Sequence, residues 1–88
     1  MYLHLGNDVV VQKSDVIGIF DLDNTSQSAL TRRYLAAAEK NGSVVNAAGL
    51  ELPKSFVVCA ENGKQTVYLS QLNSSTLLKR SESEQLSL

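Results

Sequence analysis

The chain of 88 residues is long enough for one domain and too short for two. With 43% apolar and 19% charged residues, its composition is that of a globular protein. The formal net charge of −1 argues against a strong monomeric DNA-binding domain, because such domains carry a basic surplus that neutralises phosphates. The single cysteine, Cys59, excludes an internal disulfide, and together with the single histidine, His4, it cannot supply the four ligands of a structural zinc site. No cofactor is expected. Oligomerisation is the remaining way in which a chain with such a small core could gain stability.

No apolar run approaches the roughly 20 residues that span a bilayer. The first residues also lack the basic and apolar regions of a signal peptide. Together with the single cysteine, these features predict a cytoplasmic protein that does not contact a membrane.

Three short strands are predicted in the first quarter of the chain. Residues 2–5 alternate apolar and polar side chains, residues 9–11 are β-branched, and residues 16–20 are apolar on both faces. The links between them are only a few residues long, whereas parallel pairing needs a long crossover. We therefore expect these strands to form a three-stranded antiparallel meander.

A helix is predicted from Ser28, and its signals are the strongest in the chain. Its apolar stripe has helical spacing and consists of Leu30, Tyr34, Ala37 and Ala38. Lys40 lies in the last turn, where a cation suits the helix dipole, and Gly42 follows as the residue that can adopt a positive φ. Oxygens that could cap its start are offered by Asp23, Thr25 and Ser26.

The second half of the chain predicts further strands and a short helix. Asn62-Gly63 is the signature of a tight hairpin turn between two strands. The predicted elements are strands at 44–45, 55–60 and 65–70, a loop at 46–53, and a helix at 76–80 capped from Asn73 to Ser75. The fold class is thus α+β, with one domain over residues 1–80 and a polar, flexible tail over residues 81–88.

The segment Asp21-Leu22-Asp23-Asn24-Thr25 resembles the first motif of the haloacid dehalogenase phosphatases, in which two carboxylates follow an apolar strand. That family also needs a downstream acidic pair for Mg²⁺, and no aspartate follows Asp23. The chain is too short for its core and cap. A strand end followed by a helix cap is the favoured interpretation, so no enzyme is expected, and a Mg²⁺-dependent phosphatase fragment remains a remote alternative.

Basic residues are the candidate binding groups. Arg32 and Arg33 form a pair on the first helix, while Lys13 and Lys54 lie in separate turns. A solvated helix face is the ordinary interpretation of such a pair, and phosphate contact is the functional alternative. If the sheet brings the turns to one rim, the lysines could form a patch that composition does not show. His4 is expected to be exposed on its strand, and Cys59 to be buried as a small hydrophobe.

Five segments in a particular order and spacing resemble the bacterial extracellular-matrix regulators of the RemA/RemB family, closest to its RemB members. They are residues 1–6 (MYLHLG), 16–21 (VIGIFD), 53–58 (PKSFVV), 68–70 (YLS) and 74–80 (SSTLLKR). The resemblance implies control of matrix or biofilm genes and a fold similar to the LytTR DNA-binding domain. It also implies rings that wrap DNA around a basic outer surface.

The resemblance places the DNA-binding arginines of RemA-like proteins near Asp15 and within Leu50-Glu51-Leu52. Here acids stand at or beside those positions, with Lys13 and Lys54 close by. Two hypotheses follow. In the first, a ring binds DNA by avidity through weak contacts from Lys13, Lys54, Arg32 and Arg33. In the second, the chain is a protein-interaction or structural module that forms an oligomer or pairs with a RemA-like partner, and that touches no nucleic acid.

Overall fold

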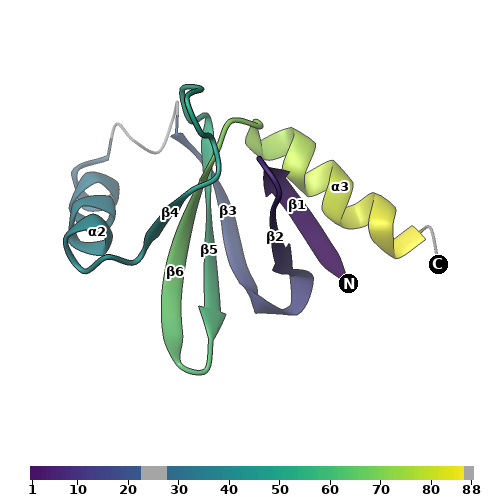
Figure 1. Cartoon of the computed structure of the whole chain (residues 1–88), viewed down its shortest axis with the longest axis horizontal. Coiled ribbons are helices and arrows are strands. Elements are labelled where there is room, and N and C mark those ends of the chain that lie inside the picture. Colours follow the sequence, from purple (N-terminus) through teal and green to yellow (C-terminus); the bar gives the residue numbers. More distant parts are fainter. Residues whose placement is uncertain (23–27, 87–88) are drawn as a thin grey trace.

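The computed structural model of the chain describes residues 1–22 and 28–86, and it confirms an α+β fold (Figure 1). The N-terminal part contains β1 (Tyr2–Gly6), β2 (Val9–Gln12), the short 3₁₀ helix η1 (Lys13–Asp15) and β3 (Val16–Asp21). The remainder contains α2 (Ala29–Lys40), β4 (Val44–Asn46), β5 (Ser55–Glu61), β6 (Lys64–Ser70) and α3 (Ser74–Leu86). No helix within these described residues is long and apolar enough to cross a membrane.

The strands form two sheets, and this corrects the expected meander. β1 and β2 make a two-stranded antiparallel sheet, whereas β3 belongs to a four-stranded sheet of order β3-β5-β6-β4. β3 and β6 both pair antiparallel with β5, and β4 pairs parallel with β6. The expectation was wrong because a short link does not force two strands into one sheet. The turn of η1 redirects the chain, so that β3 pairs with β5 while the β1–β2 hairpin packs on the sheet as a separate layer.

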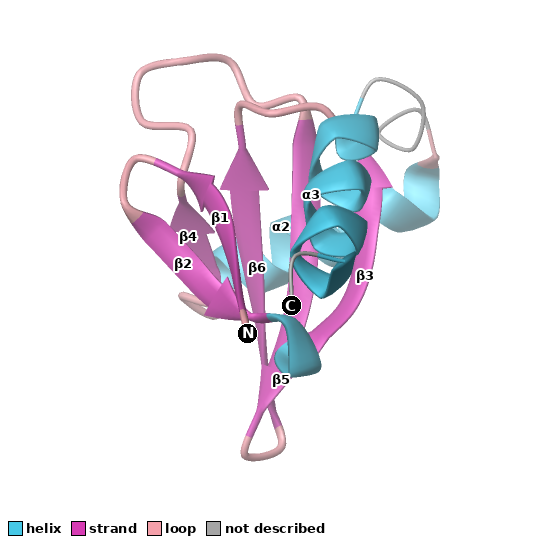
Figure 2. Cartoon of the chain, turned by 90° about the vertical axis from the view of Figure 1, so that its right-hand side faces the viewer, coloured by secondary structure: helices cyan, strands magenta, loops and turns pink. Residues whose placement is uncertain are grey.

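Each face of the four-stranded sheet has its own cover (Figure 2). The β1–β2 hairpin and α3 lie in front of the sheet in this view, and α2 lies behind it. Because side chains alternate along a strand, β5 serves both faces. Val57 and Cys59 pack under the hairpin and α3, on what we call the inner face, and Phe56 and Val58 point to the α2 side, the outer face.

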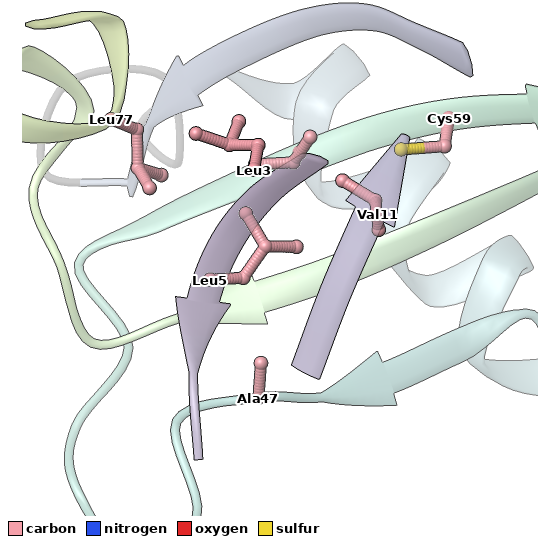
Figure 3. Packing of buried hydrophobic residues seen from close by; sticks show 7 residues of the cluster. Leu3, Leu5, Val11, Ala47, Cys59 and Leu77 are labelled. Carbon is pink, nitrogen blue, oxygen red and sulfur yellow. The ribbon is translucent and has the colours of Figure 1, made fainter. Parts of the chain in front are cut away.

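The inner face holds the main core (Figure 3). Its buried side chains come from β1, β2, β5, α3 and the residue after β4, and they are Leu3, Leu5, Val11, Ala47, Val57, Cys59 and Leu77. Two serines on this face are fully buried. Ser70 Oγ donates to Leu5 O at 2.6 Å and Ser55 Oγ donates to Leu72 O at 2.7 Å, so both hydroxyls are paired, as burial requires.

Local signals in the sequence are confirmed at several turns. Asn62 and Gly63 both have positive φ, at 55° and 78°, as a type I′ hairpin turn demands. Gly42 has φ 71° immediately after the Asn41 C-cap of α2. The N-cap of α2 is Ser28, whose side chain accepts a hydrogen bond from Thr31 N.

This cap assignment differs from the expected one. Asp23, Thr25 and Ser26 lie outside the described residues, and Ser28 stands at the capping position because α2 begins at Ala29. Its spacing to Thr31 matches the usual N-cap to N3 hydrogen bond.

Helix α3 is longer than the sequence suggested. Asn73 Oδ1 accepts from Thr76 N at 2.8 Å, so the expected cap is confirmed. The helix continues past Arg80 to Leu86, and the polar segment 81–86, expected to be a flexible tail, is therefore helical. One contact that the sequence did not show supports the extension: Lys13 Nζ donates to Ser81 O from the opposite end of the chain.

Candidate nucleic-acid interface

Lys13 is half-buried in η1, and its ammonium group faces α3. Its Nζ donates a hydrogen bond to the backbone oxygen of Ser81. A donor used in this way ties η1 to α3, and a phosphate would have to displace the contact. The geometry therefore gives Lys13 a structural role that its position in a turn did not indicate.

Lys54 occupies the end of the four-stranded sheet that lies away from Lys13. Its backbone is fixed on both sides, because its N donates to Ser70 O at 2.8 Å and its O accepts from Leu22 N at 3.0 Å. Its side chain is exposed. The seven residues of β5 separate this end from η1, which corresponds to about 20 Å at the rise of a strand. The sheet therefore does not bring the two lysines to one rim.

Arg32 and Arg33 are exposed on α2, at the outer face. Neighbouring residues on a helix point about 100° apart. Arg33 follows Leu30 by three residues and lies on the same side of the helix, whereas Arg32 points further round. The helix is attached to the sheet by Tyr34, whose hydroxyl donates to Gln65 Oε1 at 3.0 Å. The cations of α2 and Lys54 thus lie on elements that Lys13 does not touch.

The residues weighed for other chemistry have ordinary environments. His4 is exposed on β1 between buried Leu3 and Leu5, as expected. Cys59 is buried, and this burial, with the nearby carboxylates of Asp15 and Glu61, raises the pKa of its thiol to about 11. A thiol with such a pKa is protonated at neutral pH and is a poor nucleophile.

The phosphatase-like segment is only partly visible. Asp21 ends β3 opposite Ser55, and the rest of the segment, from Asp23 to Thr25, lies outside the described residues. Within the described part of the chain, no group of three or more His, Cys, Asp or Glu side chains could hold a metal ion.

The sequence did not reveal an apolar groove on the outer face. It lies between α2 and the β3–β5 pair, has a volume of about 360 Å³, and is lined chiefly by Ile17, Phe20, Leu30, Tyr34, Phe56 and Val58. We call it the outer groove. The apolar stripe that contains Leu30 and Tyr34 is the signal in the sequence that could have indicated this groove. Leu30 is 74% exposed, because the helix covers the sheet incompletely.

The fold is that of a small α+β domain, and sequence comparison gives its class. The family described as "RemA-like: Extracellular matrix regulatory protein A-like" matches residues 2–80, and the chain belongs to that family.

Among individual relatives, the chain is similar to the "Extracellular matrix regulatory protein B" of Bacillus subtilis (strain 168). The two are 40% identical over 82 residues, which covers 93% of this chain and 91% of the relative.

Proposed function

We propose that this protein regulates extracellular-matrix genes as a cytoplasmic, non-enzymatic, ring-shaped oligomer that contacts DNA weakly. The family and the name of the Bacillus relative support the regulatory role. Weak contact follows from the net charge of −1, because nine acidic residues offset the eight Lys and Arg residues.

The observation that carries the DNA contact is the exposure of Lys54, whose backbone is fixed on both sides, and of the two α2 arginines. Exposed cations whose supporting backbone is fixed can approach phosphates without refolding. One subunit offers only two or three such contacts, which is too few for useful affinity alone. A ring repeats them around its circumference, and each bound subunit raises the effective concentration of DNA for the next.

The oligomer is supported by the outer face. Ile17 and Leu30 are 59% and 74% exposed on either side of the outer groove. A monomer of this size gains nothing from leaving such side chains in water, and contiguous apolar surface of this kind marks an interaction site.

The test is DNA binding at two salt concentrations, with the double variant Arg32→Gln/Lys54→Gln. Fluorescence anisotropy on duplex DNA should show binding by the wild-type assembly at low salt. The variant should bind more weakly, and its salt slope should fall by about two for each engaged subunit, because each cation lost releases about one counterion fewer. The matched control is Lys79→Gln/Arg80→Gln, which removes an equal charge from α3 and should change the slope little.

A second candidate is an oligomeric protein-interaction module that touches no nucleic acid, alone or with a RemA-like partner. It is favoured by the acid Glu51 and the exposed leucines beside it, in the loop where the resemblance placed arginines. Absence of binding by the assembled wild type at low salt would overturn the DNA-contact proposal in favour of this one.

A further inference from the structure

The outer groove is an apolar site that the chain builds and leaves open. Its floor is a stacked pair of rings, Phe20 and Phe56, whose centroids are 5.0 Å apart with planes 21° from parallel. Gly18 makes this stack possible, because a Cβ at that position would stand 2.7 Å from the Phe20 ring. The sides of the groove are formed by Ile17 and by Leu30 of α2. Ile17 lies at an irregularity in the β3–β5 pairing. The groove is lined mainly by apolar side chains, and no part of the described chain fills it.

A second apolar feature lies in the β4–β5 connection. Leu50 is fully exposed and Leu52 is 81% exposed, and we call residues 49–52 the leucine loop. Single exposed leucines are common, but two in one short loop form a projecting apolar surface.

The leucine loop is held in place by side-chain hydrogen bonds. Asn46 Nδ2 donates to Gly49 O at 3.1 Å, and Asn46 Oδ1 accepts from Ala48 N at 3.0 Å. Asn7 Nδ2, from the β1–β2 turn, donates to Ala47 O at 2.9 Å. Gly49 has φ 64°, and a Cβ there would meet Asn7 at 2.8 Å, so glycine is required. A loop fixed in this way loses little conformational entropy when its leucines bind.

The loop and the groove lie at different edges and faces of the molecule. The loop leaves the sheet at the β4 edge, where Ala47 N donates to Leu69 O and the Ala47 side chain is buried in the inner-face core. The groove lies on the outer face beside β3, the opposite edge strand. Because the loop is anchored at the inner face, it cannot fold back into the groove of its own chain. It can, however, reach the groove of another copy.

The charges beside the two features are complementary. Glu51 lies between the two leucines and is exposed, and Arg33 is exposed on α2, three residues after the groove residue Leu30. An exposed pair of this kind adds little affinity, but it fixes the orientation of a docked loop.

We propose that the leucine loop of one copy docks into the outer groove of the next, with Leu50 and Leu52 in the groove and Glu51 against Arg33. The contact joins two different surfaces, so it is heterologous, and repeated head to tail it closes into a ring or grows into a filament. It rests on the proposed oligomer and assigns Arg33 to the interface between copies rather than to DNA.

The test uses two variants that each remove one half of the contact. Leu50→Ser/Leu52→Ser removes the loop's apolar side chains, and Leu30→Glu places a charge in the groove. Both changes are at exposed positions, so circular dichroism and thermal unfolding should match the wild type. By size-exclusion chromatography with light scattering, the wild type should be a multimer and each variant a monomer. Leu78→Ser, which removes an exposed leucine from α3, is the matched control and should assemble like the wild type.

Mixing the two variants separates this contact from a symmetric one. The loop variant keeps an intact groove and the groove variant keeps an intact loop, so an equimolar mixture should form a dimer and nothing larger. If the wild type assembles but the loop variant assembles equally well, or if Leu78→Ser dissociates the assembly, the docking proposal is wrong while the proposed oligomer stands. A monomeric wild type at all concentrations would overturn both.

Discussion

The two faces of the four-stranded sheet are built from alternating residues of the same strands, yet they have different environments. On the inner face, Leu3, Leu5 and Leu77 are at most 1% exposed, because the β1–β2 hairpin and α3 cover the sheet closely. On the outer face, Phe56 and Val58 are buried, but Leu30 and Ile17 beside them remain largely exposed. Apolar residues at both alternating positions along a strand therefore indicate that both faces of the sheet need a cover. They do not show whether the same chain supplies that cover.

The largest expected difference between the faces is in the cost of deleting a leucine. Leu77→Ala should lower the free energy of unfolding by about 2–5 kcal/mol, because it leaves a cavity in a closed core. Leu30→Ala should cost less than about 0.5 kcal/mol in dilute protein, since little of that side chain is buried. Urea unfolding followed by circular dichroism measures both. A cost for Leu30→Ala that rises with protein concentration would show that a second copy covers the outer face.

The buried hydroxyls of the inner face give an intermediate effect. Ser70→Ala removes the donor to Leu5 O and the acceptor of Leu72 N, and burial keeps water from replacing them. The expected loss is about 1–3 kcal/mol in the free energy of unfolding. Ser75→Ala, at an exposed position on α3, is the control and should change stability by less than about 0.5 kcal/mol. Equal effects would mean that the inner face admits water.

The smallest effect is a pH dependence from Cys59. Its thiol has a pKa raised from the ordinary 9.0 to about 11, so between these values the folded state holds a proton that the unfolded state has lost. The contribution of this thiol to the free energy of unfolding is fully present below pH 9 and is lost as pH rises towards 11. The free energy of unfolding should therefore fall by about 1 kcal/mol between pH 8 and pH 10. Unfolding of wild type and Cys59→Ala across this range isolates the contribution. The same slope in both proteins would show that the thiol is accessible to water.

Features that depend on a few neighbouring residues could be predicted from the sequence. The Asn62-Gly63 turn, the Gly42 helix end and the Asn73 cap each follow from local backbone chemistry. The exposure of His4 between buried Leu3 and Leu5 follows from strand periodicity. The family resemblance, which rested on the order of five segments, is confirmed over residues 2–80.

Features that depend on contacts between distant segments could not be predicted from the sequence. Pairing of β3 with β5 rather than β2 joins residues some 40 positions apart, and no local pattern distinguishes the two partners. The candidate site illustrates the same limit. Lys13 and Lys54 are equivalent in sequence as turn lysines, but one donates to Ser81 O, 68 residues away, and the other is exposed at the far end of β5.

The sequence by itself therefore determined the α+β class, the Asn62-Gly63 turn, the Asn73 cap and the family, because each is set by short-range backbone preferences or by segment order. Only the tertiary structure decided that Lys13 contacts α3, which face of the sheet is closed, and that Leu50 and Leu52 are exposed. The physical reason is that burial and hydrogen bonding are settled by which surfaces meet in space. Residues with the same local pattern, such as Leu30 and Leu77 on their two helices, then have opposite exposures.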